Sequence, residues 1–247
     1  MAKKDFDNRR AQLRAMQQAE ARKKKNRTIV LVVLAVVLAV VVVGGGVAAV
    51  LKFRESQEAS FPPSANKDHT GMAINKAPDA RKLEIYLDYQ CPFCKKFEET
   101  MAPTIESMIE SGDVEVTYHT MIFLDKNLRN DASERATNAS YCADEQGVYD
   151  EFHKAVFQNQ PQTEGQNAYP DALIRDELPK QVGLEGEKLL AFQTCYDDRK
   201  FDDYVKRVDN EAGKAGVTGT PTIRVDGEDI DLQQISSPED FRNAVLN

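Results

Sequence analysis

The 247-residue chain has few of the side chains that bind structural metals, with four cysteines and three histidines. A structural zinc site takes four ligands, usually supplied as two closely spaced pairs. One such pair is present, Cys91 and Cys94, and no second Cys-x-x-Cys or His-x(3–5)-His pair completes a set. Internal repeats are also absent, and nothing in the sequence indicates nucleic-acid binding. The sequence therefore predicts no metal centre and no bound cofactor.

The most informative motif is Cys91-Pro92-Phe93-Cys94, which lies where a predicted strand over 83–89 meets a predicted helix over 95–110. This spacing puts both sulfurs within disulfide reach on one helical turn. At the start of a helix, unpaired N–H groups and the helix dipole stabilise a thiolate and lower the thiol pKa. The motif predicts a redox pair in which Cys91 exchanges with substrate and Cys94 is its resolving partner.

A second motif centres on Pro221, which directly precedes a short β-rich run ending in an Asp-Gly turn. Proline cannot donate to a β-ladder, so it belongs at the first residue of an edge strand. The Thr220–Pro221 bond is a candidate for cis geometry. The alternative is an ordinary proline at the start of a strand.

Together, the two motifs resemble the thioredoxin superfamily, in which a cis-proline loop packs against the active disulfide. A finer resemblance, to the DsbA-like oxidoreductases of the bacterial cell envelope, is carried by residues 88–95, 152–161 and 216–222. It implies an α/β thioredoxin fold over 76–247, interrupted by a helical insertion at about 128–204. It also implies that Cys91 and Cys94 are catalytic and that Thr220 and Pro221 contact the substrate.

Hydrophobic periodicity gives the elements of this region. The predicted strands are 83–89, 114–122, 222–225 and 229–232, and the predicted helices are 95–110, 132–146, 148–158, 171–182, 187–196, 200–215 and one capped by Ser237. His153, on one of these helices, is expected to have a packing role, and His119, on a strand, is a weaker candidate for approaching the active site.

Two positions depart from the DsbA-like pattern. Phe93 stands where the best-known member has a histidine, and it offers the Cys91 thiolate neither charge nor hydrogen bond. Relatives also often bury a carboxylate about six residues before the first cysteine. Here Ile85 occupies that position and Glu84 is expected to face the other side of the strand. The sequence assigns no acid to Cys94.

The first 75 residues predict where this domain is located. Residues 29–51 carry no charged or strongly polar side chain, and 23 residues at 1.5 Å each span roughly 34 Å, enough to cross a bilayer core of about 30 Å. We predict a transmembrane helix at 28–51, a cytoplasmic tail at 1–27 and a polar linker at 52–75. The tail has ten Lys and Arg against three acidic residues, and positive charge favours the cytoplasm. A cleaved signal peptide is the alternative.

An exported domain lies in an oxidising compartment, so Cys142 and Cys195, expected in two different helices of the insertion, should form a structural disulfide. Two buried free thiols are the alternative. The resemblance implies an enzyme that forms disulfide bonds in reduced or unfolded exported proteins. It also implies re-oxidation by a quinone-linked membrane partner, DsbB-like or vitamin K epoxide reductase-like. An envelope reductase or isomerase, or a membrane-tethered holdase without turnover, stays open.

Overall fold

The structure is a computed structural model that describes residues 60–247. The predicted cytoplasmic tail at 1–27, the predicted transmembrane helix at 28–51 and the start of the predicted linker lie outside the described residues. Within 60–247, no helix is both long and apolar enough to cross a membrane.

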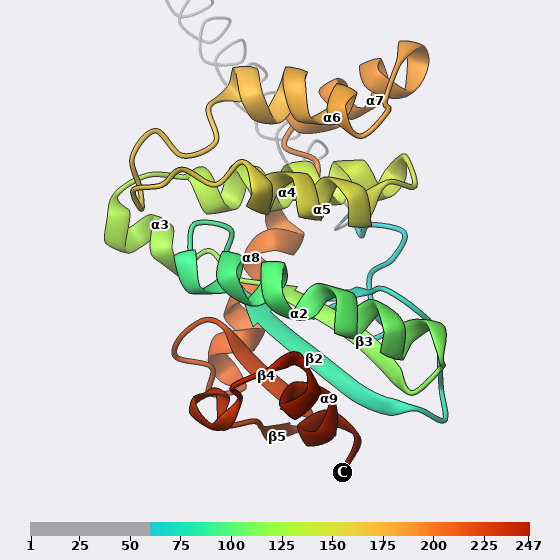
Figure 1. Ribbon diagram of the computed structural model, residues 1–247. Coiled ribbons are helices and arrows are strands. Elements are labelled where there is room, and N and C mark those ends of the chain that lie inside the picture. The colour runs from blue at the N-terminus through green and yellow to red at the C-terminus, as the bar shows by residue number, and fades with distance from the viewer. Residues whose placement is uncertain (1–59) are drawn as a thin grey trace, which may run out of the picture. The chain divides into compact units, whose positions relative to one another are not determined.

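A mixed sheet lies at the centre of the domain, with strand order β1-β3-β2-β4-β5 (Figure 1). Its central strand, β2, pairs in parallel with β3 and antiparallel with β4. Leu83 and Ile85, on one face of β2, are completely buried, and Tyr86 on the other face is 3% exposed, so both faces are covered towards the end of the strand. The strands are β1 (Met72–Ala73), β2 (Arg81–Leu87), β3 (Val114–Thr120), β4 (Thr222–Val225) and β5 (Glu228–Asp229).

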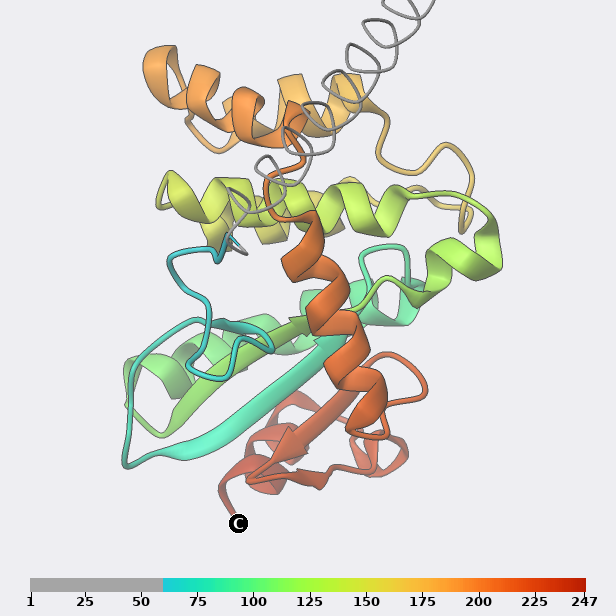
Figure 2. The same cartoon turned by 180° about the vertical axis from the view of Figure 1, so that it is seen from behind.

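Helices cover both faces of the sheet. The first, α2 (Pro92–Glu110), packs beside α9 (Pro238–Leu246) on one face, and α8 (Asp202–Lys214) crosses the other, which Figure 2 shows from behind. Helix α9 begins as predicted, because the Ser237 hydroxyl accepts a hydrogen bond from the backbone N–H of Asp240. The sheet and these three helices form the α/β core that the resemblance to the thioredoxin fold implies.

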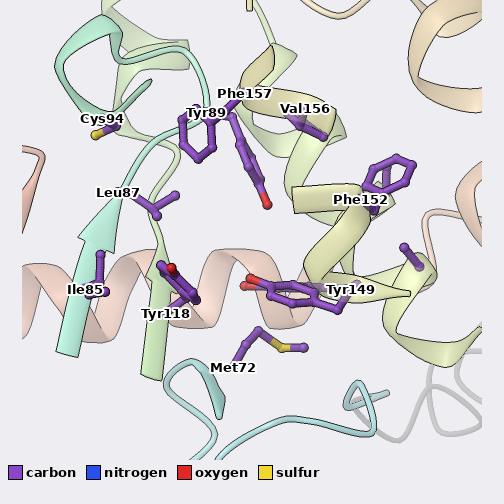
Figure 3. Packing of buried hydrophobic residues seen from close by; sticks show 14 of the residues in the cluster. Met72, Ile85, Leu87, Tyr89, Cys94, Tyr118, Tyr149, Phe152, Val156 and Phe157 are labelled. Carbon is purple, nitrogen blue, oxygen red and sulfur yellow. The ribbon is translucent and has the colours of Figure 1, made fainter. Parts of the chain in front are cut away.

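Between β3 and α8 the chain leaves the sheet and forms a helical insertion, seen as two stacked helical layers in Figure 1. The insertion consists of α3 (Phe123–Leu128), α4 (Ala132–Glu145), α5 (Tyr149–Gln158), the π-helix η1 (Ala172–Glu177), α6 (Leu178–Gln181) and α7 (Gly186–Asp197). It packs against the core through a buried aromatic cluster. Figure 3 shows Tyr89, from the loop after β2, beside Phe157 of α5, with ring centroids 5.0 Å apart.

The linker predicted over 52–75 is wrong where the structure describes it, because part of this segment belongs to the sheet. Met72 is completely buried, and β1 pairs antiparallel with β3. The Tyr204 hydroxyl donates to the Gly71 carbonyl at 2.8 Å. A Cβ at Gly71 would lie 2.6 Å from the Tyr118 carbonyl oxygen, so only glycine permits this close approach.

Two further elements differ from the prediction. The helix expected over 171–182 contains a π-helical segment followed by α6, where Pro179 occupies the first turn. Proline lacks an N–H and crowds the carbonyl four residues before it, and a wider turn relieves that crowding. The strand expected over 229–232 ends early, because the Asp231 side chain accepts from the Gln233 backbone N–H and starts the 3-10 helix η2 (Leu232–Gln234) instead.

Candidate active site

Cys91 is the N-cap residue of α2, directly after the turn that follows β2. Its backbone is extended (φ −75°, ψ 117°), and its carbonyl oxygen accepts from the Lys95 N–H at 3.2 Å. Pro92 fits the first helical position, where an N–H would have no partner. Cys91 and Cys94 are free thiols; Cys91 is 5% exposed and Cys94 is completely buried. Of the two sulfurs, Cys91 is the one with access to solvent.

The surroundings of the two thiols shift their pKa values in opposite directions. The pKa of Cys91 is lowered from 9.0 to about 6, first by a hydrogen bond from the Cys94 side chain and further by Thr220 and the backbone N–H groups of Cys94 and Phe93. Burial opposes this and is outweighed. Burial raises the pKa of Cys94 well above 9.0, and the neighbouring Cys91 raises it further. At neutral pH this geometry gives a Cys91 thiolate beside a Cys94 thiol.

The loop before β4 reaches the same place. Because β4 runs antiparallel to β2, with Thr222 opposite Tyr86, the residues before Thr222 meet those after Tyr86. The Thr220–Pro221 peptide bond is cis, and the Cys91 Sγ lies 3.4 Å from the Thr220 carbonyl oxygen, to which it donates in its thiol form. The fold therefore brings both predicted motifs together, although they are separated by about half of the chain.

Phe93 projects outward from the turn that carries the two cysteines. Its side chain is 72% exposed, the largest exposed fraction among the big apolar residues of the described region. Its ring makes none of the aromatic contacts found within 60–247. Phe93 contacts the Cys91 thiolate only through its backbone N–H. The active-site turn thus presents an apolar ring to solvent instead of an ionisable one.

The other two cysteines lie within the insertion. Cys142 of α4 and Cys195 of α7 are joined by a disulfide with an S–S distance of 2.02 Å. This is the pairing expected from the sequence, and it links helices α4 and α7 of the insertion.

Comparison with known proteins now identifies the family. A protein-family model described as thioredoxin matches residues 67–246. The chain belongs to the thioredoxin family. The match begins within the predicted linker and includes both cysteine pairs and the cis-proline loop.

Several thioredoxin-fold relatives carry names of one enzyme class. Disulfide bond formation protein D of Bacillus subtilis is 28% identical over 144 residues, which are 58% of this chain and 62% of that protein. Among solved structures, the MdbA thiol-disulfide oxidoreductase of Actinomyces oris has a TM-score of 0.63 and 23% identity over 77% of this chain and 93% of its own. Oxidised DsbA of Mycobacterium tuberculosis has a TM-score of 0.54 and 27% identity over 68% and 84%. The predicted class, a protein thiol-disulfide oxidoreductase, agrees with these names.

In this thioredoxin-family site, a buried carboxylate that the sequence did not indicate lies three residues before Cys91. Asp88 is completely buried and accepts hydrogen bonds from the Ser133 hydroxyl at 2.6 Å and the backbone N–H groups of Gln90 and Leu124 at 2.9 and 3.2 Å. Burial outweighs these donors and raises the pKa of Asp88 from 3.8 to about 7. An ionisable acid therefore lies beneath the active-site turn.

His153 has the packing role expected for it, within a small polar cluster. It is 1% exposed, its Nδ1 lies 2.9 Å from the Tyr89 hydroxyl, and its Nε2 lies 3.5 Å from a carboxylate oxygen of Glu98. Glu98 follows Cys94 by one turn of α2, and Tyr89 lies two residues before Cys91. Through these contacts His153 joins α5 to Tyr89, before the active-site turn, and to Glu98 of α2, after it.

The imidazole of His119 contacts Thr70 and Glu84 and neither of the active-site cysteines. Its Nδ1 lies 2.7 Å from the Thr70 carbonyl oxygen, and its Nε2 lies 3.3 Å from Glu84, whose carboxyl pKa it lowers. Glu84 does face away from the cysteine side of β2, as its sequence position indicated. Across residues 60–247, no three His, Cys, Asp or Glu side chains gather in a way that could hold a metal ion.

Proposed function

We propose that the protein is a thiol-disulfide oxidoreductase that forms disulfide bonds in exported proteins through Cys91 and Cys94. The observation that carries the proposal is the opposite shift of the two thiol pKa values at the start of α2, next to the cis-proline loop. A stabilised Cys91 thiolate favours the reduced form of the enzyme, and so makes its disulfide a stronger oxidant.

The reaction begins with the Cys91–Cys94 disulfide. A substrate thiolate attacks the Cys91 Sγ; a bond forms between the substrate sulfur and Cys91, the Cys91–Cys94 bond breaks, and Cys94 takes up a proton. A second substrate thiolate then attacks the first substrate sulfur and releases Cys91. The substrate thiols lose two electrons, which the enzyme's disulfide gains. A thiol with a low pKa is a fast leaving group, so the surroundings of Cys91 accelerate the second step.

Substrate binding is assigned to the surface beside Cys91. The cis Thr220–Pro221 loop lies against Cys91, and Phe93 adds an exposed apolar ring from the same turn as Cys91. An extended segment of an unfolded chain, with apolar residues near its cysteine, suits such a surface because hydrophobic contact does not require a specific sequence. Reduced exported proteins are the substrates that we infer.

The anchor at 28–51 and the basic tail at 1–27 are part of the same proposal. They would hold residues 76–247 on the outer side of the membrane, within reach of newly exported chains. The electrons gained by Cys91 and Cys94 would pass to a quinone-linked membrane protein, DsbB-like or vitamin K epoxide reductase-like, which restores the disulfide.

The test is the reduction potential of the Cys91–Cys94 pair in the full chain, titrated against glutathione at several pH values. An oxidase requires a potential well above the thioredoxin value of about −270 mV. Reduction takes up two protons below the Cys91 pKa and one proton above it. The potential should therefore fall by about 59 mV per pH unit below pH ~6 and by about 30 mV above it.

Other outcomes separate the alternatives. A potential near that of thioredoxin would assign the chain as an envelope reductase or isomerase. The absence of a reversible couple would leave a holdase, which should bind unfolded chains equally well after C91A and C94A are combined. The C142A/C195A variant serves as the control, because it isolates the active pair from the structural disulfide.

A further inference from the structure

The stretch over 152–161 carries part of the resemblance to DsbA-like proteins, but none of its residues takes part in the proposed exchange reaction. In the structure its last polar residue, Gln160, lies just after α5 and is 8% exposed. The Gln160 Nε2 donates to two carbonyl oxygens of the active-site turn, that of Tyr89 at 2.7 Å and that of Cys91 at 3.0 Å. One side-chain amide has two hydrogens, and here each has an acceptor.

Tyr169, from the loop between α5 and η1, contacts the same turn. Its hydroxyl donates to the Tyr89 carbonyl oxygen at 2.7 Å, and its side chain is 1% exposed. Its backbone is left-handed, with φ +50°, directly before Pro170. Large side chains rarely adopt this conformation, and it persists only where the surroundings require it. The loop is thus held in the conformation that points this hydroxyl at the turn.

We propose that Gln160 and Tyr169 are positioning residues for the Cys91 thiolate, through which the helical insertion sets the geometry of the active-site turn. The proposal rests on the proposed function for its biological meaning and on these three hydrogen bonds for its physical content. Neither residue touches the reacting sulfur; both act through the backbone of Tyr89 and Cys91.

The physical link is the rotation about the Cα–C bond of Cys91. This rotation, with ψ at 117°, sets where the Cys91 carbonyl oxygen points and also how the first turn of α2 is oriented relative to the Cys91 side chain. Pro92 has no N–H, so the first backbone donors available to the sulfur are those of Phe93 and Cys94. Fixing the carbonyl oxygen with Gln160 therefore holds these two N–H groups toward the thiolate.

The bond to Tyr89 fixes the other end of the turn. The Tyr89 carbonyl oxygen is bonded by two side chains of the insertion, Gln160 and Tyr169, and its residue is completely buried. If both donors are lost, a buried carbonyl oxygen has no partner, which favours movement of the turn toward water. The turn then no longer presents Cys91 at a fixed angle to α2.

The test compares Gln160→Leu, Tyr169→Phe and the control Gln158→Leu in the full chain. Gln158 is exposed on α5, two residues before Gln160, so the same substitution there changes no bond to the turn. The measurement is the rate at which iodoacetamide alkylates Cys91 in the reduced protein as a function of pH, followed by mass spectrometry of the Cys91 peptide.

We expect Gln160→Leu to lower the thiolate fraction of Cys91 at pH 6 about threefold to fivefold. This decrease corresponds to a rise of less than about one unit in the Cys91 pKa. Tyr169→Phe removes a single hydroxyl and should give a smaller decrease in the same direction. Gln158→Leu should match the wild type. Thermal unfolding of each variant separates loss of stability from loss of positioning.

An unchanged alkylation profile in Gln160→Leu and Tyr169→Phe, with or without a lower melting temperature, overturns the inference and leaves both residues as structural. The proposed function fails separately, because it requires disulfide transfer by the wild type. A wild type that has an acidic Cys91 but transfers no disulfide would refute the oxidase while the positioning result stands.

Discussion

Burial acts on the Asp88 carboxyl and on both active-site thiols, with different net effects on their pKa values. It raises the pKa of the Asp88 carboxyl and of the Cys94 thiol, because the charged form loses hydration. Cys91 is also desolvated, but hydrogen bonds to its thiolate outweigh that cost. The turn therefore keeps one stable anion next to two groups that favour their neutral forms.

The raised pKa of Asp88 predicts a specific pH dependence of stability. Its native pKa of about 7 exceeds the ordinary value of 3.8, so between these values the native state binds more proton than the unfolded state. This contribution to stability is fully present below pH ~3.8 and is lost as the pH rises through ~7. We expect D88N to remove a slope of up to about 1.4 kcal/mol per pH unit over this window. Urea unfolding at several pH values measures it.

Asparagine is suited to the test, because its oxygen can still accept from Ser133 and Gln90 while it cannot ionise. D203N, at an exposed position in the first turn of α8, is the matched control. If wild type and D88N lose stability in parallel between pH 4 and 7, Asp88 is ionised in the native protein and the argument from burial is wrong.

Some residues of the site could be predicted from the sequence and others could not. The Cys91 and Cys94 pair and the Thr220–Pro221 loop follow from short motifs with known local geometry. Asp88 could not be found in this way, because its burial depends on Ser133 and Leu124 from another part of the chain. The same holds for Gln160 and Tyr169, whose acceptors are carbonyl groups and leave no trace in the sequence.

At the scale of elements, the strands and helices with a regular apolar pattern agree with prediction to within a few residues. Strand β4 was predicted exactly as found, and α4 and α5 differ by one residue at an end. The elements that were not predicted, β1 and α3, are too short to show a periodic pattern of apolar residues. Strand β1 has two residues and exists through its pairing with β3, and α3 has six residues, capped by the backbone bond from Arg129 N–H to the Asp125 carbonyl.

The disulfide between α4 and α7 should stabilise the insertion by limiting its unfolded state. It closes a loop of 53 residues, for which the chain-entropy relation gives about 4 kcal/mol. We expect C142A/C195A to lower the free energy of unfolding by about this amount. Urea denaturation at constant pH measures it, with both proteins also carrying C91A/C94A so that no other disulfide forms.

The same comparison checks that the disulfide is structural. In the presence of Cys91 and Cys94, the C142A/C195A variant should keep a redox couple at the wild-type potential, since the active-site turn contacts α5 and the loop after it and not the disulfide. A loss of stability below ~1 kcal/mol would show that the unfolded chain gains little freedom when the bond is removed.

Across the whole molecule, charge is divided unequally. Residues 1–27 carry a net charge of +7 and the total is −8, so residues 28–247 carry −15. A basic segment next to an apolar stretch retains that segment in the cytoplasm, and the acidic remainder favours solubility. The proposed orientation, with residues 76–247 outside, requires a charge distribution of this kind.

This orientation makes a prediction for intact cells. A protease added outside should digest residues 76–247 while an epitope tag at the N-terminus stays protected until the membrane is opened. Neutralising the five basic residues just before the apolar stretch, Arg22, Lys23, Lys24, Lys25 and Arg27, to glutamine should reduce the fraction with this orientation severalfold. A tag digested in intact cells, or a domain released into the medium by signal cleavage, would contradict the anchor.

The disulfide found in the insertion joins Cys142 to Cys195, the cysteines that follow the Cys91 and Cys94 pair in the chain. The first cysteine is therefore proposed to pair with the second, and the third is paired with the fourth. In the proposed topology residues 1–27 stay in the cytoplasm, and the exported part emerges from its membrane-proximal end, with Cys91 and Cys94 ahead of Cys142 and Cys195. A pattern that pairs consecutive cysteines forms in order of emergence, so it requires no later exchange between the two pairs.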